Sequence, residues 1–147
     1  MTTLWREKLA ALSADLIFAP AASEEAVRDC ERELGLELPQ ELREIVLESN
    51  GIKAQYGVGL VWPIVQISDT NRYFRSSEDF RELYMPFDPL LFFGDAGNGD
   101  QFAYAINDGL VRRDDIFAWI HEDDSRTWVA PSLDRYFEWW LEGRINL

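Results

Sequence analysis

Hydrophobic residues in the first third of the chain recur at three- and four-residue intervals, which places them on one face of a helix. The apolar positions are Trp5, Leu9, Leu12 and Leu16 in a first stripe, Val27, Cys30 and Leu34 in a second, and Leu42, Ile45 and Val46 in a third. Ser23 is a suitable N-cap and Gly35 a suitable C-terminal residue for the second helix, and Pro39 suits the start of the third. The pattern predicts three N-terminal helices. The first is interpreted as a helix and not as a signal peptide, because Asp15 interrupts its apolar run.

The middle of the chain has a mixed pattern with shorter elements. The run Gly59–Trp62 is typical of a short strand, and Pro63 is suited to open a helix that reaches about Arg75. Ser76 and Asp79 have the spacing of a capping box, which predicts a further short helix.

From Pro89 onward the pattern becomes that of strands. The continuous apolar run Leu90–Phe93 is typical of a strand buried on both faces, and a half-buried strand follows at 102–106, before a hairpin signal at 107–109. Two more strands are predicted at 116–120 and 127–130. A final helix begins after the N-cap Ser132, with apolar positions at Leu133, Tyr136, Phe137, Trp140 and Leu141.

These elements predict an α+β fold, with one mostly antiparallel sheet packed against N-terminal helices and a C-terminal helix. The chain has no internal repeat, low-complexity tract or Pro/Gly/Ser linker, so we expect residues 1–147 to form a single domain.

The net charge of the chain excludes several classes of function. The 147 residues include 27 acidic and 14 basic side chains, a net charge of −13, which disfavours binding to nucleic acid or to an anionic membrane. No apolar run reaches the roughly 18 residues of a transmembrane helix. Cys30 is the only cysteine, which excludes an internal disulfide and, with no targeting segment, indicates a reducing cytoplasm.

Catalytic and metal-binding motifs find little support. The spacing of Gly94, Gly97 and Gly99 matches neither a dinucleotide fingerprint nor a P-loop, and it fails the calcium-loop template. His121 is the only histidine and stands beside three acids at 122–124, a composition that fits a solvated hairpin tip better than a metal site. We therefore predict no catalytic residue, no cofactor and no metal.

Four segments carry a resemblance to a known family. They are the stretch 33–39 (ELGLELP) with Leu42 and Ile45-Val46 after it; Asn50-Gly51; Leu91–Gly94 with Gly97, Gly99-Asp100 and Phe102; and Ala130, Ser132 and Leu133 with the aromatic run to Trp140. Their order and spacing over residues 23–142 resemble the Smi/Knr cell-wall-assembly-regulator-like family, also called the SUKH immunity superfamily, although 57–89 matches poorly. The resemblance implies an α+β fold without common catalytic residues. For bacterial members it implies an immunity protein that neutralises a toxin, often a nuclease, and for fungal members a regulatory scaffold.

The predicted function is that of a cytoplasmic, non-catalytic domain that binds a protein partner, a basic toxin domain. From their chemistry, the predicted contact residues are Asp95, Asn98 and Asp100 in the glycine turn, His121, Glu122, Asp123 and Asp124 on the acidic hairpin, and Trp119 as an aromatic anchor. The alternatives are a scaffold module with another protein partner, and an enzyme or metal protein built on the acidic loops. The oligomeric state stays open.

Overall fold

The computed structural model describes residues 4–147 and has an α+β fold, as predicted. In chain order the elements are α1 (Leu4–Leu12), β1 (Ile17–Phe18), α2 (Glu24–Leu34), α3 (Gln40–Glu48), β2 (Ile52–Lys53), the 3₁₀ turn η1 (Gln55–Gly57), β3 (Gly59–Val61), α4 (Ile64–Ser76), α5 (Glu78–Leu83), β4 (Leu90–Asp95), β5 (Gln101–Ala105), β6 (Ile116–Ile120), β7 (Ser125–Ala130) and α6 (Leu133–Leu141). Residues 1–3 of the predicted domain lie outside the described residues. Within residues 4–147, no helix has the length and apolarity needed to cross a membrane.

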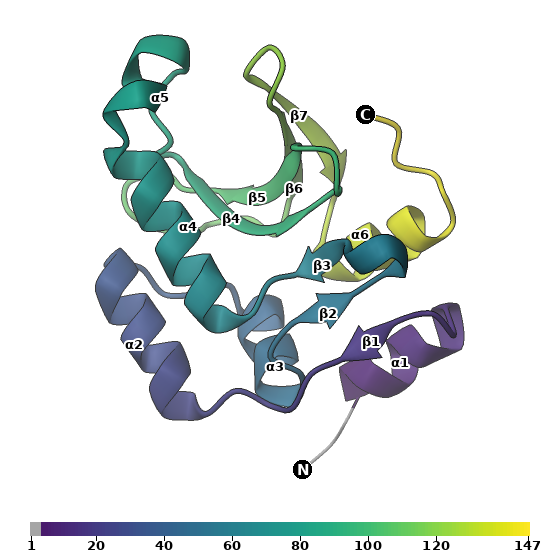
Figure 1. Ribbon diagram of the computed structural model, residues 1–147. Helices are drawn as coiled ribbons and strands as arrows, with labels where there is room; N and C mark the ends of the chain where they lie inside the picture. The colour runs from purple at the N-terminus through teal and green to yellow at the C-terminus, as the bar shows by residue number, and fades with distance from the viewer. Residues whose placement is uncertain (1–3) are drawn as a thin grey trace.

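The strands form two antiparallel sheets where one was expected. The larger sheet is the predicted meander β4-β5-β6-β7, and a small sheet β1-β2-β3 lies in front of it in Figure 1. A backbone hydrogen bond from Trp62 N to Phe93 O, 2.8 Å long, joins β3 to β4. Strands β1 and β2 have two residues each, which is too short for an alternating pattern to appear in the sequence.

The predicted caps of α2 are confirmed. The Ser23 hydroxyl accepts a hydrogen bond from Ala26 N at 3.0 Å, and Gly35 adopts the left-handed conformation with φ +63°. The predicted helical stripe at the N-terminus is only partly correct. Trp5 and Leu9 are buried, but α1 ends at Leu12, which is 39% exposed, because the chain then turns to pair β1 with β2.

The four-stranded sheet is covered on both faces. Phe92 packs against Phe74 of α4, and its neighbour Phe93 packs against Tyr136 of α6 on the opposite face. This alternation explains why residues 90–93 of β4 are all apolar, as the sequence predicted. The capping box at Ser76 is wrong, since Ser76 ends α4 and its hydroxyl donates to Arg72 O, but the short helix that it predicted is present as α5.

Side chains from α4 cover the outer edge of β4. Asn71 is 1% exposed; its Nδ2 donates to Phe92 O at 2.8 Å, and its Oδ1 accepts from Phe92 N at 2.8 Å. Arg75 Nη2 donates to Leu90 O at 3.1 Å. The outward-facing backbone groups of Leu90 and Phe92 therefore find partners on α4, whereas Phe93 O accepts its hydrogen bond from Trp62 N.

Candidate functional site

The two acidic turns predicted from the sequence lie together at one end of the four-stranded sheet. Strands β5 and β6 are antiparallel, with Gln101 opposite Trp119. The β4–β5 turn and the β6–β7 turn therefore lie at the same end of the sheet. Asp100 links them, because its Oδ1 accepts a hydrogen bond from His121 N at 3.0 Å and lies 2.7 Å from His121 Nδ1. We call residues 95–100 and 121–124 the turn end.

The contact between the turns depends on Gly99. This residue has a φ of +103°, and a Cβ atom built on it would lie 2.8 Å from Cε1 of the His121 ring. Asp100 is 4% exposed, so its carboxylate acts inside the turn end and is not available to a partner. Burial of this carboxylate disfavours the predicted contact, and a partner-binding role for Asp100 stays a prediction.

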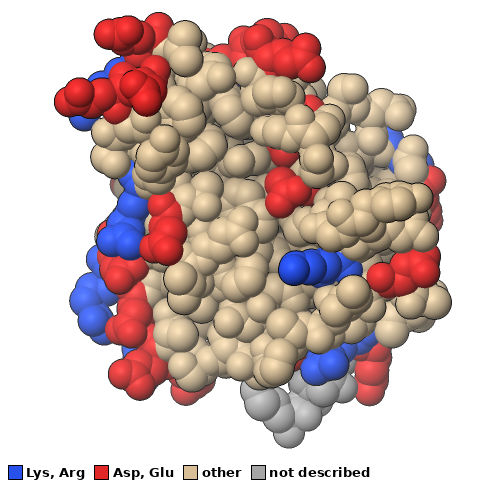
Figure 2. All heavy atoms as spheres, in the orientation of Figure 1, with Lys and Arg blue, Asp and Glu red and all other residues tan. Residues whose placement is uncertain are grey.

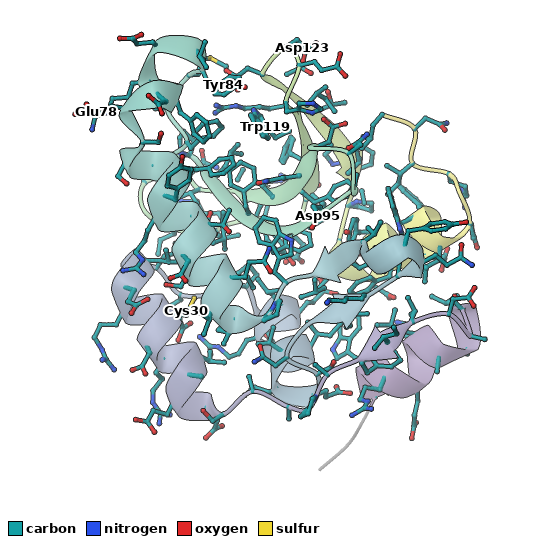
Figure 3. The ribbon with its side chains drawn as sticks, viewed as in Figure 1. Cys30, Glu78, Tyr84, Asp95, Trp119 and Asp123 are labelled. Atoms are coloured by element: carbon teal, nitrogen blue, oxygen red, sulfur yellow. The ribbon has the colours of Figure 1, made fainter. Side chains whose placement is uncertain are left out.

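Trp119 is buried, which disfavours its predicted role as an aromatic anchor for a partner. It is 4% exposed, and its ring packs edge-to-face on Tyr84 and Phe87, with centroids 5.3 Å away in both cases. Its position on β6 directs the ring to the face of the sheet that α4 and α5 cover. Figure 3 shows Trp119 and Tyr84 beside each other in this region.

Asp124 serves the fold as well. Its carboxylate accepts hydrogen bonds from Trp119 Nε1 and Met85 N, both at 2.8 Å, and forms an ion pair with Arg126 at 3.1 Å. Arg126 in turn donates to Met85 O and Pro86 O at 3.0 Å. This network holds the segment between α5 and β4 against the β6–β7 turn.

Three predicted residues at the turn end remain exposed: Asn98, Glu122 and Asp123. Asn98 Oδ1 accepts a hydrogen bond from Asp100 N at 3.0 Å, which closes the first turn. Asp123 Oδ1 accepts hydrogen bonds from the hydroxyl and the backbone N of Ser125, and these bonds lower the pKa of Asp123. Within residues 4–147, no three side chains of His, Cys, Asp or Glu are grouped so that they could hold a metal ion.

Asp95 belongs to a second feature, a groove of about 490 Å³ beside the small sheet. Its Oδ2 accepts a hydrogen bond from Trp62 Nε1 at 2.7 Å, and its Oδ1 accepts one from Gly97 N at 2.9 Å. The groove is lined by Ile17, Ala19, Asn50, Gly51, Ile52, Lys53, Gly57, Gly59, Val61, Trp62, Pro63, Gln66 and Asp95. Asp95 and Lys53 are the two charged residues among these thirteen.

Exposed apolar side chains lie next to this groove. Ile17 lines it and is 65% exposed. Val65 and Tyr56 adjoin the lining residues Gln66 and Gly57 in the chain, are 65% and 99% exposed, and themselves line two other hollows of the surface. Figure 2 shows a broad surface almost without charge in this view, with acidic groups gathered above it over α5 and over the β6–β7 turn. We call the groove with Ile17, Tyr56 and Val65 the uncharged face.

The uncharged face could not be predicted from the sequence. Its residues come from β1, β2, η1, β3 and the start of α4, elements that are distant along the chain or too short to produce a periodic pattern. Among the tryptophans, Trp128 on β7 is 48% exposed, and its Nε1 donates to Asp115 Oδ1 at 2.9 Å.

Comparison with known proteins identifies the family. A comparison with curated proteins found no match. A model of the SMI1 / KNR4 family (SUKH-1) matches residues 21–139, a range that begins before α2 and includes most of α6. Because this range is most of the chain, the protein belongs to the SMI1 / KNR4 family (SUKH-1).

Proposed function

We propose that this chain is an immunity-type binding domain that neutralises a cognate toxin by covering the toxin's working surface. The observation that carries the proposal is the charge distribution: a chain of net charge −13 has one broad, nearly uncharged face, with acidic side chains gathered above it in Figure 2. Protein interfaces are depleted of charge at their centre, and a charged border steers a partner of opposite sign. Membership of the SMI1 / KNR4 family (SUKH-1) supports the proposal.

The proposed action is binding without catalysis. Cys30 is 3% exposed, and burial, followed by the charges of Glu33 and Glu31, raises the pKa of its thiol to about 12, which makes it a poor nucleophile. His121 is held by Asp100 in the turn end, and among residues 4–147 its ring is not hydrogen-bonded to a serine, threonine or cysteine side chain. The lone cysteine also fits a reducing cytoplasm, where an immunity protein would meet an incoming toxin.

Co-expression tests the proposal directly. We expect the chain to restore growth of cells that express the C-terminal domain of the toxin encoded by the neighbouring gene, and to bind that domain in a biosensor assay. If the partner is basic, the association rate should fall steeply between about 50 and 200 mM salt. The proposal is overturned if the chain neither binds the domain nor restores growth, whereas binding without restored growth favours a scaffold function.

The exposed acids of the turn end provide a specific variant. We expect the double substitution Glu122→Gln and Asp123→Asn to slow association and leave dissociation nearly unchanged, because both side chains are exposed border charges. The matched control is Glu24→Gln with Glu25→Gln in the first turn of α2, which removes the same charge elsewhere. Equal loss of association rate in both variants would assign steering to net charge alone.

A further inference from the structure

We propose that the uncharged face is the docking surface itself, and that it receives an apolar loop carrying one lysine or arginine, presented by a domain with a basic surface around that loop. This inference rests on the proposed function and names the surface and the chemistry of the partner. Three observations support it: the composition of the groove, the conformation of Tyr56, and the environment of Asp95.

The groove is depleted of charge compared with the rest of the molecule. Charged residues make up 28% of the chain but only Lys53 and Asp95 among the thirteen residues that line the groove. Its volume of about 490 Å³ is large enough for the side chains of a short protein loop. Depletion of charged residues is a feature of the centres of protein interfaces.

Tyr56 presents its ring to solvent at a conformational cost. Its φ of +61° and ψ of +21° lie in the left-handed region, which is unfavourable for a residue with a Cβ atom. The side chain is 99% exposed, so the ring gives the fold almost no burial in return. Tyrosine is among the residues enriched at binding hot spots, and a partner that covers this ring would account for its position.

Asp95 supplies the recognition of a cation. Each of its oxygens accepts one hydrogen bond, from Trp62 Nε1 and from Gly97 N, and each keeps a free lone pair. The carboxylate is half-buried and held in place by these bonds, so it is preorganised for an incoming ammonium or guanidinium group. Trp62 itself is 3% exposed and serves as the floor of the groove.

The charge around the face selects the occupant. Acidic groups over α5 and over the β6–β7 turn border the uncharged surface in Figure 2. A second copy of the chain would bring the same acidic border and another net charge of −13 against it, which opposes self-association. A partner with a basic surface around an apolar loop is complementary to the apolar centre of the face and to its acidic border.

The test measures binding of the same neighbouring toxin domain to four single variants. Tyr56→Ala and Asp95→Asn change the uncharged face; Trp128→Ala and Asp108→Asn make the matched changes at other exposed positions, where Trp128 is 48% exposed and the Asp108 side chain 92%. We expect Tyr56→Ala to raise Kd by about 30-fold or more and Asp95→Asn by about 10-fold, with the controls within about threefold of the unaltered chain. Denaturation midpoints check that each variant is folded, and the full exposure of Tyr56 keeps the test usable if Asp95→Asn unfolds.

The outcomes separate the two proposals. If the unaltered chain neither binds the toxin domain nor restores growth, both the proposed function and the proposed docking surface are overturned. If it binds, but Tyr56→Ala and Asp95→Asn bind equally well while Trp128→Ala loses binding, the uncharged face is refuted and the function stands. A dimer in sedimentation experiments that Tyr56→Ala dissociates would assign the face to a second copy and also overturn the inference.

Discussion

Replacing Asn71 with alanine tests how the outer edge of β4 is stabilised. The Asn71 side chain is 1% exposed and makes three hydrogen bonds, from Nδ2 to Ile67 O at 2.7 Å, from Nδ2 to Phe92 O at 2.8 Å and from Phe92 N to Oδ1 at 2.8 Å. It therefore occupies the place of a neighbouring strand for one residue of β4. Alanine removes these bonds without adding bulk or charge.

The expected loss of stability follows from the groups left behind. The N–H and C=O of Phe92 become buried without this partner, and each such group costs about 1–3 kcal/mol. The sum, about 2–6 kcal/mol, is a large part of the roughly 5–15 kcal/mol that stabilises a domain of this size. Asn71→Asp should be at least as harmful at neutral pH, because its carboxylate accepts from Phe92 N but faces two carbonyl oxygens.

Urea unfolding followed by tryptophan fluorescence provides the measurement. We expect a lower midpoint for Asn71→Ala with little change in slope, and a change within about 0.5 kcal/mol for the control Asn107→Ala at an exposed turn. If Asn71→Ala is as stable as Asn107→Ala, the edge of β4 does not depend on α4 and the reasoning fails.

Three further predictions concern single residues. Tyr56→Gly should stabilise the fold by about 1 kcal/mol in urea unfolding, since glycine tolerates the positive φ; a loss of stability would show that the ring packs in solution. Cys30, whose pKa burial raises to about 12, should react with a disulfide reagent at pH 8 at least about 100-fold more slowly in the native protein than in urea; rapid native labelling would contradict its burial. Burial, and then Asp114 and Asp134, raises the pKa of Glu41 above its unfolded value, so its ionisation costs stability as pH rises through the folded pKa. Glu41→Gln should therefore be more stable than the unaltered chain at pH 7 but not below about pH 4, and an equal advantage at both pH values would refute this account.

The elements with long periodic patterns could be predicted from the sequence. The caps Ser23 and Ser132 and the stripe along α6 identify helices, and the apolar run in β4 identifies a strand covered on both faces. The small sheet could not be predicted, because β1 and β2 are two residues long and are held by pairing across the chain. The same pairing ends α1 at Leu12, four residues before the apolar stripe ends.

The candidate site was predictable only in its location along the chain. The sequence placed two acidic turns in adjacent hairpins, and antiparallel pairing does bring them together at the turn end. The burial of Asp100 and Trp119 could not be predicted, because the local sequence does not reveal which side chains are used inside the fold. In the sequence, the Asp100 carboxylate next to glycines is typical of an exposed group that could bind a partner. In the structure it is instead used in a contact with the ring of His121.

The acidic surface and the uncharged face both raise the free energy of the isolated domain. A chain with 13 excess negative charges lowers its self-repulsion by spreading them over its whole surface. Leaving one broad face almost without charge crowds the remaining acids and raises that repulsion, and the exposed Tyr56, Ile17 and Val65 add apolar surface in contact with water. Neither feature stabilises the isolated domain. A basic partner with an apolar loop relieves both costs at once, and this shared relief favours one docking surface over two separate ones.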